Sequence, residues 1–342
     1  MEQNYKYMVV TKCMTYNQSK FICDTLKGFE MQATTFPVVY CIVDDASTDG
    51  EQGLLQSWAE QHLMLNEKDV AYKKSFSYGE IIYARHKDNS NCFFLFLFLK
   101  ENHHGKKAKE PYLSEWADNS KYCAFCEGDD YWTDPYKLQK QVDFLEAHPD
   151  YGMCHTDFYT TGRRRITPIK PQEDDMYWPS ILINGIRIGT VTSVVRNSIY
   201  NNIPKLYSGK GWPIGDLPIW YEIARVSKIK YLPEITATYR IVAESASHSQ
   251  SLEKVLRYEE KKMEMKRFYA KTYNVEVDER IWETQSYEII IRFAARNRRV
   301  DVAEKYFAEA KKKNIVSRKM QLYYYAAKCS LIEWLLRKVH LL

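Results

Sequence analysis

The stretch VVYCIVDDASTDG, residues 38–50, joins an uninterrupted apolar run to an acidic loop that ends on glycine. The run 38–43 is rich in β-branched side chains and predicts a strand buried on both faces, as in a parallel sheet. Residues 7–13 are also mostly apolar and β-branched. Between the two runs, residues 18–32 carry apolar side chains at helical spacing. A further helix is expected after Asp49-Gly50. The order strand, helix, strand, helix predicts an α/β fold with a mixed, mostly parallel sheet flanked by helices.

A second acidic loop follows another strand-like run. Residues 122–126 predict a short strand that leads into Glu127-Gly128-Asp129-Asp130. Asp134-Pro135 then signals the start of a helix, because aspartate caps helices and proline suits their first turn. Further strands are expected at 152–155 and 188–195.

The chain divides into two expected parts. Residues 1–250 carry the α/β pattern, with an insertion at about 66–109, where regular periodicity is hard to see except for the apolar run 92–99, a buried strand or helix segment. Residues 251–342 predict a helical C-terminal subdomain. Its four segments with apolar residues at helical spacing are 252–270, 280–297, 300–312 and 318–340.

The composition is that of a globular protein, with 45% hydrophobic and 27% charged residues. The first six residues are polar and lack the apolar core of a secretory signal, so we expect the chain to remain in a reducing cytoplasm. The eight cysteines are then expected as free thiols. The longest apolar run, 92–99, is far shorter than the roughly 20 residues of a membrane span.

Charge is unevenly distributed along the chain. Residues 251–342 contain 21 Lys+Arg against 13 Asp+Glu, a net charge of +8, whereas residues 1–250 have a net charge of −3. This asymmetry fits a bilayer or a diphosphate-bearing partner better than nucleic acid, although a solvated helical face would give the same counts. Trp334, Leu335 and Leu336 beside Arg337 and Lys338 can form an interfacial helix on the inner face of the cytoplasmic membrane. Packing on the rest of the chain or on a second copy, as a homo-oligomer, remains an alternative.

The carboxylates of the second acidic loop suggest a metal site. Glu127, Asp129 and Asp130 lie within four residues, where like charges repel unless a cation offsets them. Hard oxygen ligands suit Mn²⁺ or Mg²⁺, and Mg²⁺ is commonly held by one or two carboxylates plus substrate phosphates. An acidic turn with Asp134 as a helix cap is the alternative, which the preceding strand and the following Tyr131-Trp132 disfavour. The first acidic loop, at Asp44 and Asp45, should converge on the second because both follow strands of one sheet.

Other sites are disfavoured. Cys123 and Cys126 cannot share a zinc ion within one strand, since their odd spacing points them to opposite faces. Neither a Gly-x-Gly-x-x-Gly motif nor a P-loop is found in the sequence, so dinucleotide oxidoreductases and nucleoside triphosphatases lack their key loop.

Three motifs, Thr15-Tyr16-Asn17, residues 43–49 and residues 126–132, together resemble glycosyltransferase family 2. The resemblance covers roughly residues 7–250 and is closest to bacterial members that build capsular polysaccharide or lipopolysaccharide. It implies a GT-A fold, the Rossmann-like fold of nucleotide-diphospho-sugar transferases. It further implies a metal-dependent, inverting transfer of a hexose or N-acetylhexosamine from a nucleotide sugar, with a UDP-sugar favoured. The implied acceptor is a saccharide or lipid-linked saccharide in surface polysaccharide synthesis.

The resemblance also implies site residues. It places Asp130 on the metal with Asp129 beside it near the ribose. Glu127 stands where the family usually has aspartate, and its longer arm leaves its partner open. From the basic segments we add Lys106 as a phosphate contact, with solvated charge as the alternative. The residues expected around the nucleotide sugar are Thr15, Tyr16, Asn17, Asp44, Asp45, Glu127, Asp129, Trp132, Lys106, Arg240 and His248.

The catalytic base is expected at Asp216. An inverting transfer needs a carboxylate opposite the leaving nucleoside diphosphate, and Asp216 precedes a helical pattern in a segment that resembles the family's base-bearing motif. Many relatives have Glu-Asp where this chain has Gly215-Asp216. Aspartate is also a favoured N-cap, and the two roles are compatible because capping donors favour the ionised form.

Two alternative functions remain from the sequence. A nucleotidyltransferase would share the broad fold, but its Gly-rich basic loop after the first strand is missing. A non-catalytic saccharide-binding or scaffold protein would use the same fold without chemistry. Loss of Asp130 or Asp216 would favour that class, and both residues are present.

Overall fold

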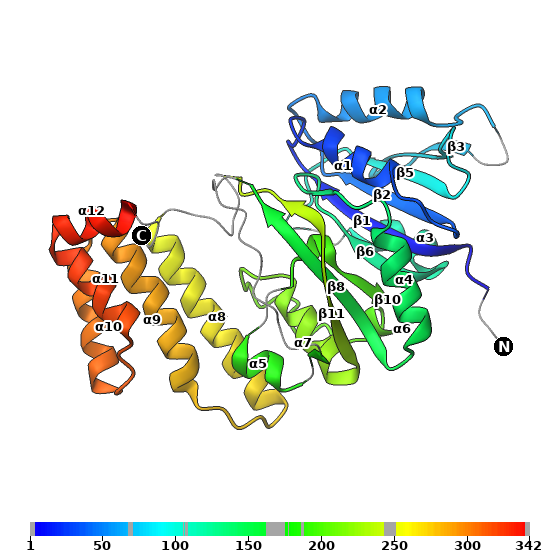
Figure 1. The fold of residues 1–342 in the computed structure, drawn as a ribbon. Helices are drawn as coiled ribbons and strands as arrows, with labels where there is room; N and C mark the ends of the chain where they lie inside the picture. Colours follow the sequence, from blue (N-terminus) through cyan, green and yellow to red (C-terminus); the bar gives the residue numbers. More distant parts are fainter. Residues whose placement is uncertain are drawn as a thin grey trace. The chain divides into compact units, whose positions relative to one another are not determined.

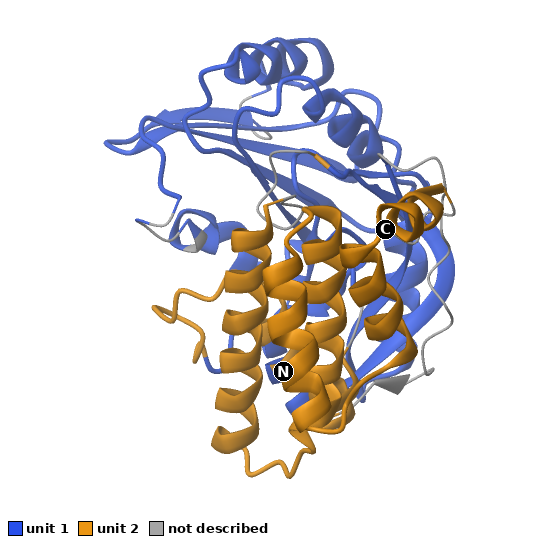
Figure 2. Cartoon of the chain, turned by 90° about the vertical axis from the view of Figure 1, so that its left-hand side faces the viewer, with its two compact units in different colours: residues 1–177, 187–204, 222–241 blue, residues 178–186, 205–221, 242–342 orange. Residues whose placement is uncertain are grey.

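The computed structural model describes residues 4–67, 71–104, 106, 109–161, 175–176, 178–185, 188–242 and 251–338 (Figure 1). Two compact units are distinguished (Figure 2). The first comprises residues 1–177, 187–204 and 222–241, and the second comprises residues 178–186, 205–221 and 242–342.

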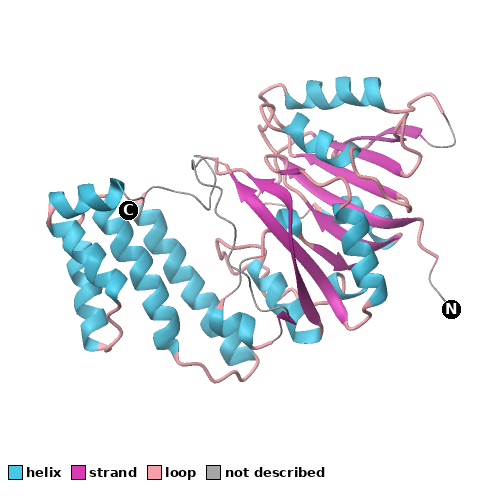
Figure 3. Cartoon of the chain, in the orientation of Figure 1, coloured by secondary structure: helices cyan, strands magenta, loops and turns pink. Residues whose placement is uncertain are grey.

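The first unit is built on one mixed sheet (Figure 3). The strand order is β3-β4-β5-β2-β1-β6-β10-β8-β11-β7, with β9 paired to β11. Strands β5, β2, β1 and β6 run parallel at the centre, which confirms the predicted α/β architecture. The strands are β1 Tyr7–Thr15, β2 Val38–Asp44, β3 Ala71–Ser75, β4 Gly79–Arg85, β5 Cys92–Leu99, β6 Ser120–Phe125, β7 Tyr131–Trp132, β8 Tyr151–Thr160, β9 Asp175–Met176, β10 Val194–Arg196 and β11 Lys228–Tyr239.

Helices follow the central strands, as the sequence predicts. Those of the first unit are α1 Ile22–Glu30, α2 Glu51–His62, α3 Ser114–Asp118, α4 Lys137–Ala147 and α6 Asn197–Tyr200, with 3₁₀ turns at η1 Glu110–Leu113 and η2 Thr190–Thr192. The boundary between the units runs through α7 Leu217–Val226.

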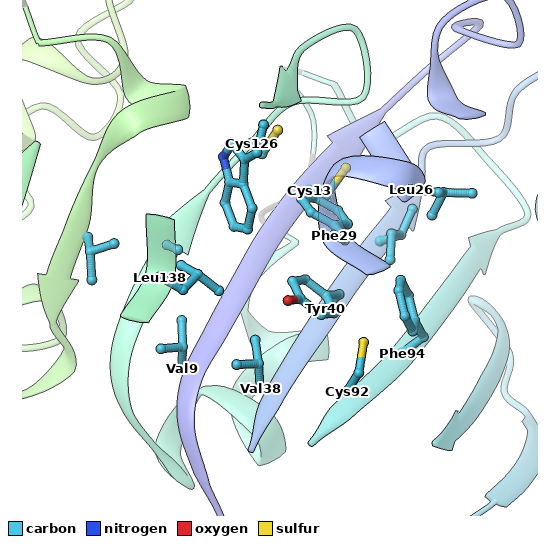
Figure 4. Close-up of a cluster of buried hydrophobic side chains, with 14 of the residues drawn as sticks. Val9, Cys13, Leu26, Phe29, Val38, Tyr40, Cys92, Phe94, Cys126 and Leu138 are labelled. Carbon is cyan, nitrogen blue, oxygen red and sulfur yellow. The ribbon is translucent and has the colours of Figure 1, made fainter. Parts of the chain in front are cut away.

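Both faces of the central sheet are buried. Along β2, Val38, Tyr40 and Ile42 belong to one hydrophobic cluster, while Val39 and Cys41 belong to the other. Figure 4 shows part of the first cluster, in which α1 and the strands β1, β2 and β5 contribute side chains. Burial on both faces explains why β2 and β5 are continuously apolar instead of alternating.

Two expected segments differ from the structure. The expected insertion at about 66–109 contributes three strands to the central sheet, and β5 pairs in parallel with β2. Its pattern is hard to read because β3 is an exposed edge strand rich in lysine. The expected strand at 188–195 is shorter, because Thr190–Thr192 form a 3₁₀ turn and the strand covers Val194–Arg196.

The cysteines are all free, and six of the eight are buried. Cys123 and Cys126 belong to the hydrophobic clusters on opposite faces of the sheet, as the spacing argument predicts. Burial raises the pKa of the Cys123 thiol to about 11, so this side chain is a small apolar core residue at neutral pH.

The second unit is helical. It contains α5 Ser180–Asn184, α8 Leu252–Thr272, α9 Glu279–Arg296, α10 Val300–Lys312, α11 Arg318–Lys328 and α12 Ser330–Lys338. The expected helix 318–340 is divided at Cys329, which is extended. This break brings Leu336 of α12 into the core around Phe307 and Met320. Among the helices that the structure describes, none is both long and apolar enough to cross a membrane.

Candidate functional site

The acidic loops converge at the carboxyl edge of the parallel strands. Thr15, at the end of β1, pairs with Asp44, at the end of β2. The Asp45 amide donates to the Thr15 carbonyl oxygen at 3.0 Å, and the Gly128 amide donates to the Met14 carbonyl oxygen at 3.1 Å. The three family-like motifs therefore meet at one place, where ligands bind in open α/β sheets.

Gly128 permits the close approach of two of these loops. A Cβ atom at this position would lie 2.4 Å from both Thr15 Oγ1 and Gln18 Oε1. Any larger residue would push the Glu127–Asp130 loop away from the end of β1. Glycine is thus required here for steric reasons, and its backbone conformation is one that other residues can adopt.

Asp130 is buried within the acidic loop, with 2% of its surface exposed. Thr25 of α1 fixes the loop by donating its hydroxyl to the carbonyl oxygens of Gly128, at 2.9 Å, and Asp130, at 2.6 Å. Burial, reinforced by the neighbouring Asp129 and Glu127 charges, raises the pKa of Asp130 well above its usual range. Burial also raises the pKa of half-buried Asp129.

This cluster fits a divalent cation. Three carboxylates share one short loop, and the structure gives the Asp130 carboxylate a backbone amide donor, Arg240 N at 2.8 Å. A hard cation would favour the ionised forms that burial and mutual repulsion oppose. The oxygen donors match Mg²⁺ or Mn²⁺.

Arg240 lies against the acidic loop, just after β11. Its guanidinium donates to the Asp129 carbonyl oxygen at 2.8 Å and pairs with Asp24 of α1. The same group lies over the rings of Tyr131, at 4.5 Å, and Phe21, at 5.0 Å. Arg240 thereby ties α1 to the loop and brings a positive charge beside Asp129.

Asp44 and Asp45 have different environments although both are buried. Asp45 Oδ1 accepts from the His103 amide at 2.7 Å, and Asp45 Oδ2 pairs with Lys109 Nζ at 2.5 Å. Asp44 Oδ1 accepts from Ser47 N and Gln52 Nε2, whereas Asp44 Oδ2 has no hydrogen-bond partner. Asp45 thus anchors the segment around His103, and Asp44 retains an unused acceptor.

The loop after β1 contacts the loop after β2. Asn17 takes a left-handed conformation, with φ 54°, and its side-chain oxygen accepts from Thr48 N at 2.8 Å. Tyr16 precedes it with 47% of its surface exposed. Ala46 also has a positive φ, 64°, which is unfavourable for alanine and concentrates backbone strain in the loop after β2.

Glu51 supports the site, and the sequence argument missed it. Its carboxylate, fully buried at the start of α2, accepts from Thr15 Oγ1, Gln18 N and Ser47 Oγ. Burial raises the pKa of Glu51. Its position directly after Gly50, in a predicted helix start, is the sequence signal that could have identified it, whereas Thr25, Asp24 and Lys109 carry no such signal.

Of the four remaining expected residues, the structure describes Trp132, Lys106 and Asp216. Trp132 is a core residue, 2% exposed, whose indole donates to the Val191 carbonyl oxygen at 2.8 Å. Lys106 is exposed, and its amide donates to His103 O. His248 lies outside the described residues. Asp216 belongs to the second unit, where it is half-buried and its carbonyl oxygen accepts the first hydrogen bond of α7, from Trp220 N.

Sequence comparison finds relatives without a known activity. No family model matches the chain. An uncharacterized protein of Mycobacterium tuberculosis strain H37Rv and one of Mycobacterium bovis are each 31% identical over 245 residues, or 69% of this chain. The chain spans 59% of the length of these relatives.

Structure comparison shows the fold. The chain superposes on mannosyltransferase PcManGT from Pyrobaculum calidifontis, in complex with GDP-Man and Mn²⁺, with a TM-score of 0.51. The match covers 95% of this chain and 86% of that one at 14% identity. The S. aureus TarS 1–349 structure in complex with UDP gives a TM-score of 0.45 at 14% identity, covering 95% of this chain and 88% of that one. The mixed sheet flanked by helices thus shares the fold of the mannosyltransferase PcManGT.

Proposed function

We propose that the protein is a nucleotide-sugar-dependent glycosyltransferase of family 2. The observation that carries the proposal is the convergence of Asp44 with the Glu127–Asp130 loop at the carboxyl ends of β1, β2 and β6. A buried acceptor without a partner, near a carboxylate loop that contains the buried Asp130, suits a ligand with a nucleobase N–H at one end and a diphosphate at the other. The fold shared with a mannosyltransferase agrees with this function.

The chain's own residues offer contacts to both ends of the donor. Asp44 Oδ2 can accept the N3–H of uracil, and the exposed Tyr16 ring provides a surface for the base. These features favour uridine as the nucleoside, and the family resemblance favours a hexose or N-acetylhexosamine as the sugar. Arg240 adds positive charge where the diphosphate would lie.

Asp130 and Asp129 would hold Mn²⁺ or Mg²⁺. When bound, such an ion offsets negative charge on the departing nucleoside diphosphate. Thr25 and Arg240 hold the loop that presents these carboxylates, so its shape does not depend on the carboxylates alone.

We propose Asp216 as the base of an inverting transfer. It would take the proton from an acceptor hydroxyl while that oxygen bonds to the anomeric carbon and the bond to the nucleoside diphosphate breaks. Its support is its place at the first turn of α7, where its carboxylate accepts from the Leu217 amide at 2.8 Å, together with the family resemblance. The acceptor we propose is a saccharide or lipid-linked saccharide of a bacterial surface polysaccharide.

Nucleotide titration tests the donor site. We expect isothermal titration calorimetry with UDP, GDP and dTDP, with and without Mn²⁺, to give the tightest binding for UDP with Mn²⁺. Asp44→Asn should weaken UDP binding roughly 10- to 100-fold, because a charge-assisted hydrogen bond is lost and an amide donor replaces an acceptor. The matched control is Asp143→Asn on the exposed face of α4.

The titration also separates the alternatives. If Asp143→Asn binds UDP as tightly as the wild type and Asp44→Asn binds UDP more weakly, the role of Asp44 in nucleobase binding is supported. If no nucleotide binds the wild type under any condition, the transferase proposal fails and a saccharide-binding scaffold becomes the better explanation.

A second proposal concerns the C-terminal helices, which we assign to an anionic lipid surface on the cytoplasmic face of the membrane. On α12, Leu331, Trp334 and Leu335 are 64%, 50% and 48% exposed, and on α11 Tyr325 is 55% exposed. Residues 318–338 contain five Lys or Arg and a single acid, Glu333, which is buried. Exposed apolar residues beside net positive charge suit such an interface.

Vesicle sedimentation tests the lipid assignment. Wild-type protein should bind vesicles containing phosphatidylglycerol and not vesicles of phosphatidylcholine alone. The double variant Trp334→Ser, Leu335→Ser should bind at least tenfold less, since two exposed apolar side chains are removed. Tyr136→Ala, an equally exposed aromatic residue of the first unit, should have no effect. Equal binding by wild type and double variant, or a wild-type dimer that the double variant abolishes, would contradict the assignment.

A further inference from the structure

We propose that Glu30, His62 and His86 form a Zn²⁺ site at the amino edge of the central sheet, away from the acidic loops. Glu30 ends α1 just before β2 begins, and His62 ends α2. His86 follows β4, whose last residue pairs with Phe93 near the start of β5. All three residues belong to the first unit, and the proposal does not depend on the nucleotide site.

The donor atoms lie close together. The Glu30 Oε2 oxygen is 3.2 Å from His62 Nδ1 and 3.7 Å from His86 Nε2. One ligand atom from each residue lies within 4.8 Å of those of the other two. Tetrahedral Zn²⁺ with bonds of about 2.0–2.2 Å places neighbouring ligand atoms about 3.3 Å apart, so small side-chain rotations complete the geometry.

The backbone holds the two histidines side by side before any ion binds. Leu63 and His86 form an antiparallel β-bridge. The Lys87 amide donates to the His62 carbonyl oxygen at 2.9 Å. The His62 ring also stacks on Trp58, with ring centroids 4.5 Å apart. Preorganisation of this kind lowers the entropic cost of assembling a metal site.

Two buried polar atoms at the site lack a hydrogen-bond partner. The His86 side chain is only 8% exposed, and its Nε2 atom points toward Glu30 without a hydrogen bond. Glu30 Oε2 is buried and makes no hydrogen bond of good geometry either, although it faces both imidazoles. Buried polar groups are normally paired, and a bound cation would satisfy both atoms.

The chemistry of these ligands favours Zn²⁺ over the cation expected at the acidic loop. Two imidazoles and one carboxylate are a known zinc ligand set, whereas Mg²⁺ prefers oxygen alone. The His62 side chain is 35% exposed, which gives water access as a fourth ligand. Binding at His86 Nε2 places the ring proton on Nδ1 and gives up the 3.2 Å hydrogen bond from the Asp88 amide.

Metal analysis with ligand variants tests the site. The purified full chain, stripped with chelator, is dialysed against ZnCl₂ with excess Mg²⁺ to occupy the carboxylate loop, and bound zinc is counted by atomic spectroscopy. We expect one Zn²⁺ per chain and a Tm several degrees above that of the stripped protein. The matched control is His148→Gln, a histidine at the end of α4.

The variants decide the assignment. Glu30→Gln and His62→Gln, both partly exposed and therefore tolerant, should each weaken zinc binding by at least about 100-fold and remove the Tm gain, while His148→Gln should retain both. A metal-free variant whose Tm equals that of the metal-free wild type is folded normally. Absence of zinc in the wild type, retention of zinc in both variants, or loss of zinc only in Asp130→Asn would each overturn the proposal.

Discussion

Asp130→Asn should abolish Mn²⁺-dependent UDP binding and lower donor turnover by more than about 100-fold, because asparagine supplies a neutral ligand where the proposed site needs a charged one. The substitution keeps the side-chain shape and the oxygen that accepts from Arg240 N. Loop geometry should therefore survive. Calorimetry of UDP with Mn²⁺ and the release of UDP from a UDP-sugar measure the two effects.

The same variant should be more stable than the wild type when metal is absent. Burial and the neighbouring carboxylates raise the pKa of Asp130, so the native state binds its proton more tightly than the unfolded state does. This contribution to stability is present below the ordinary pKa of aspartate and is lost as the pH rises through the raised pKa. At neutral pH asparagine removes the cost of a buried charge, and the Tm of Asp130→Asn should exceed that of metal-free wild type.

Asp143→Asn is the control for both measurements, since its carboxylate is exposed on α4 and accepts from Gln139. It should change neither UDP binding nor Tm. If Asp130→Asn bound UDP and Mn²⁺ as well as this control does, Asp130 would not be a metal ligand. A metal-free Tm below that of wild type would show instead that the Asp130 charge stabilises the loop.

The sheet could be predicted from the sequence where burial makes a pattern continuous. β1, β2 and β5 are buried on both faces, and their apolar runs are visible without any structure. β3 was hidden in an expected insertion because it is an edge strand that exposes polar residues. The division at Cys329 was missed for another reason: both α11 and α12 carry apolar residues at helical spacing, so the period continues across the break.

The site could be predicted only in part. Motifs located the loops at the carboxyl edge, because strand ends determine where loops lie. They did not distinguish Asp44 from Asp45. The two carboxylates differ in their partners, because Asp45 binds Lys109 and the His103 amide, which are far away in the sequence. Trp132 is a different case: its place in a loop motif suggests a ligand contact, and in the structure its buried ring packs against Phe29 and Lys137.

Asp216→Asn should lower the rate of sugar transfer roughly 10²- to 10⁴-fold, the usual contribution of a general base, while leaving UDP binding with Mn²⁺ unchanged. Asparagine is also a good N-cap, so the start of α7 should be preserved and the Tm should stay near that of wild type. Asp216→Ala separates the two roles, because it should lose transfer to the same extent and also about 1 kcal/mol of stability.

Transfer is measured with a radiolabelled UDP-sugar and the saccharide that gives the highest wild-type turnover, beside UDP titrations of each variant. Asp150→Asn, an exposed aspartate paired with Lys228, is the matched control and should transfer normally. Transfer by Asp216→Asn within tenfold of wild type would place the base elsewhere. If Asp216→Asn lost both UDP binding and transfer, Asp216 would act through the fold. A base that acts on the acceptor has no part in holding the donor nucleotide.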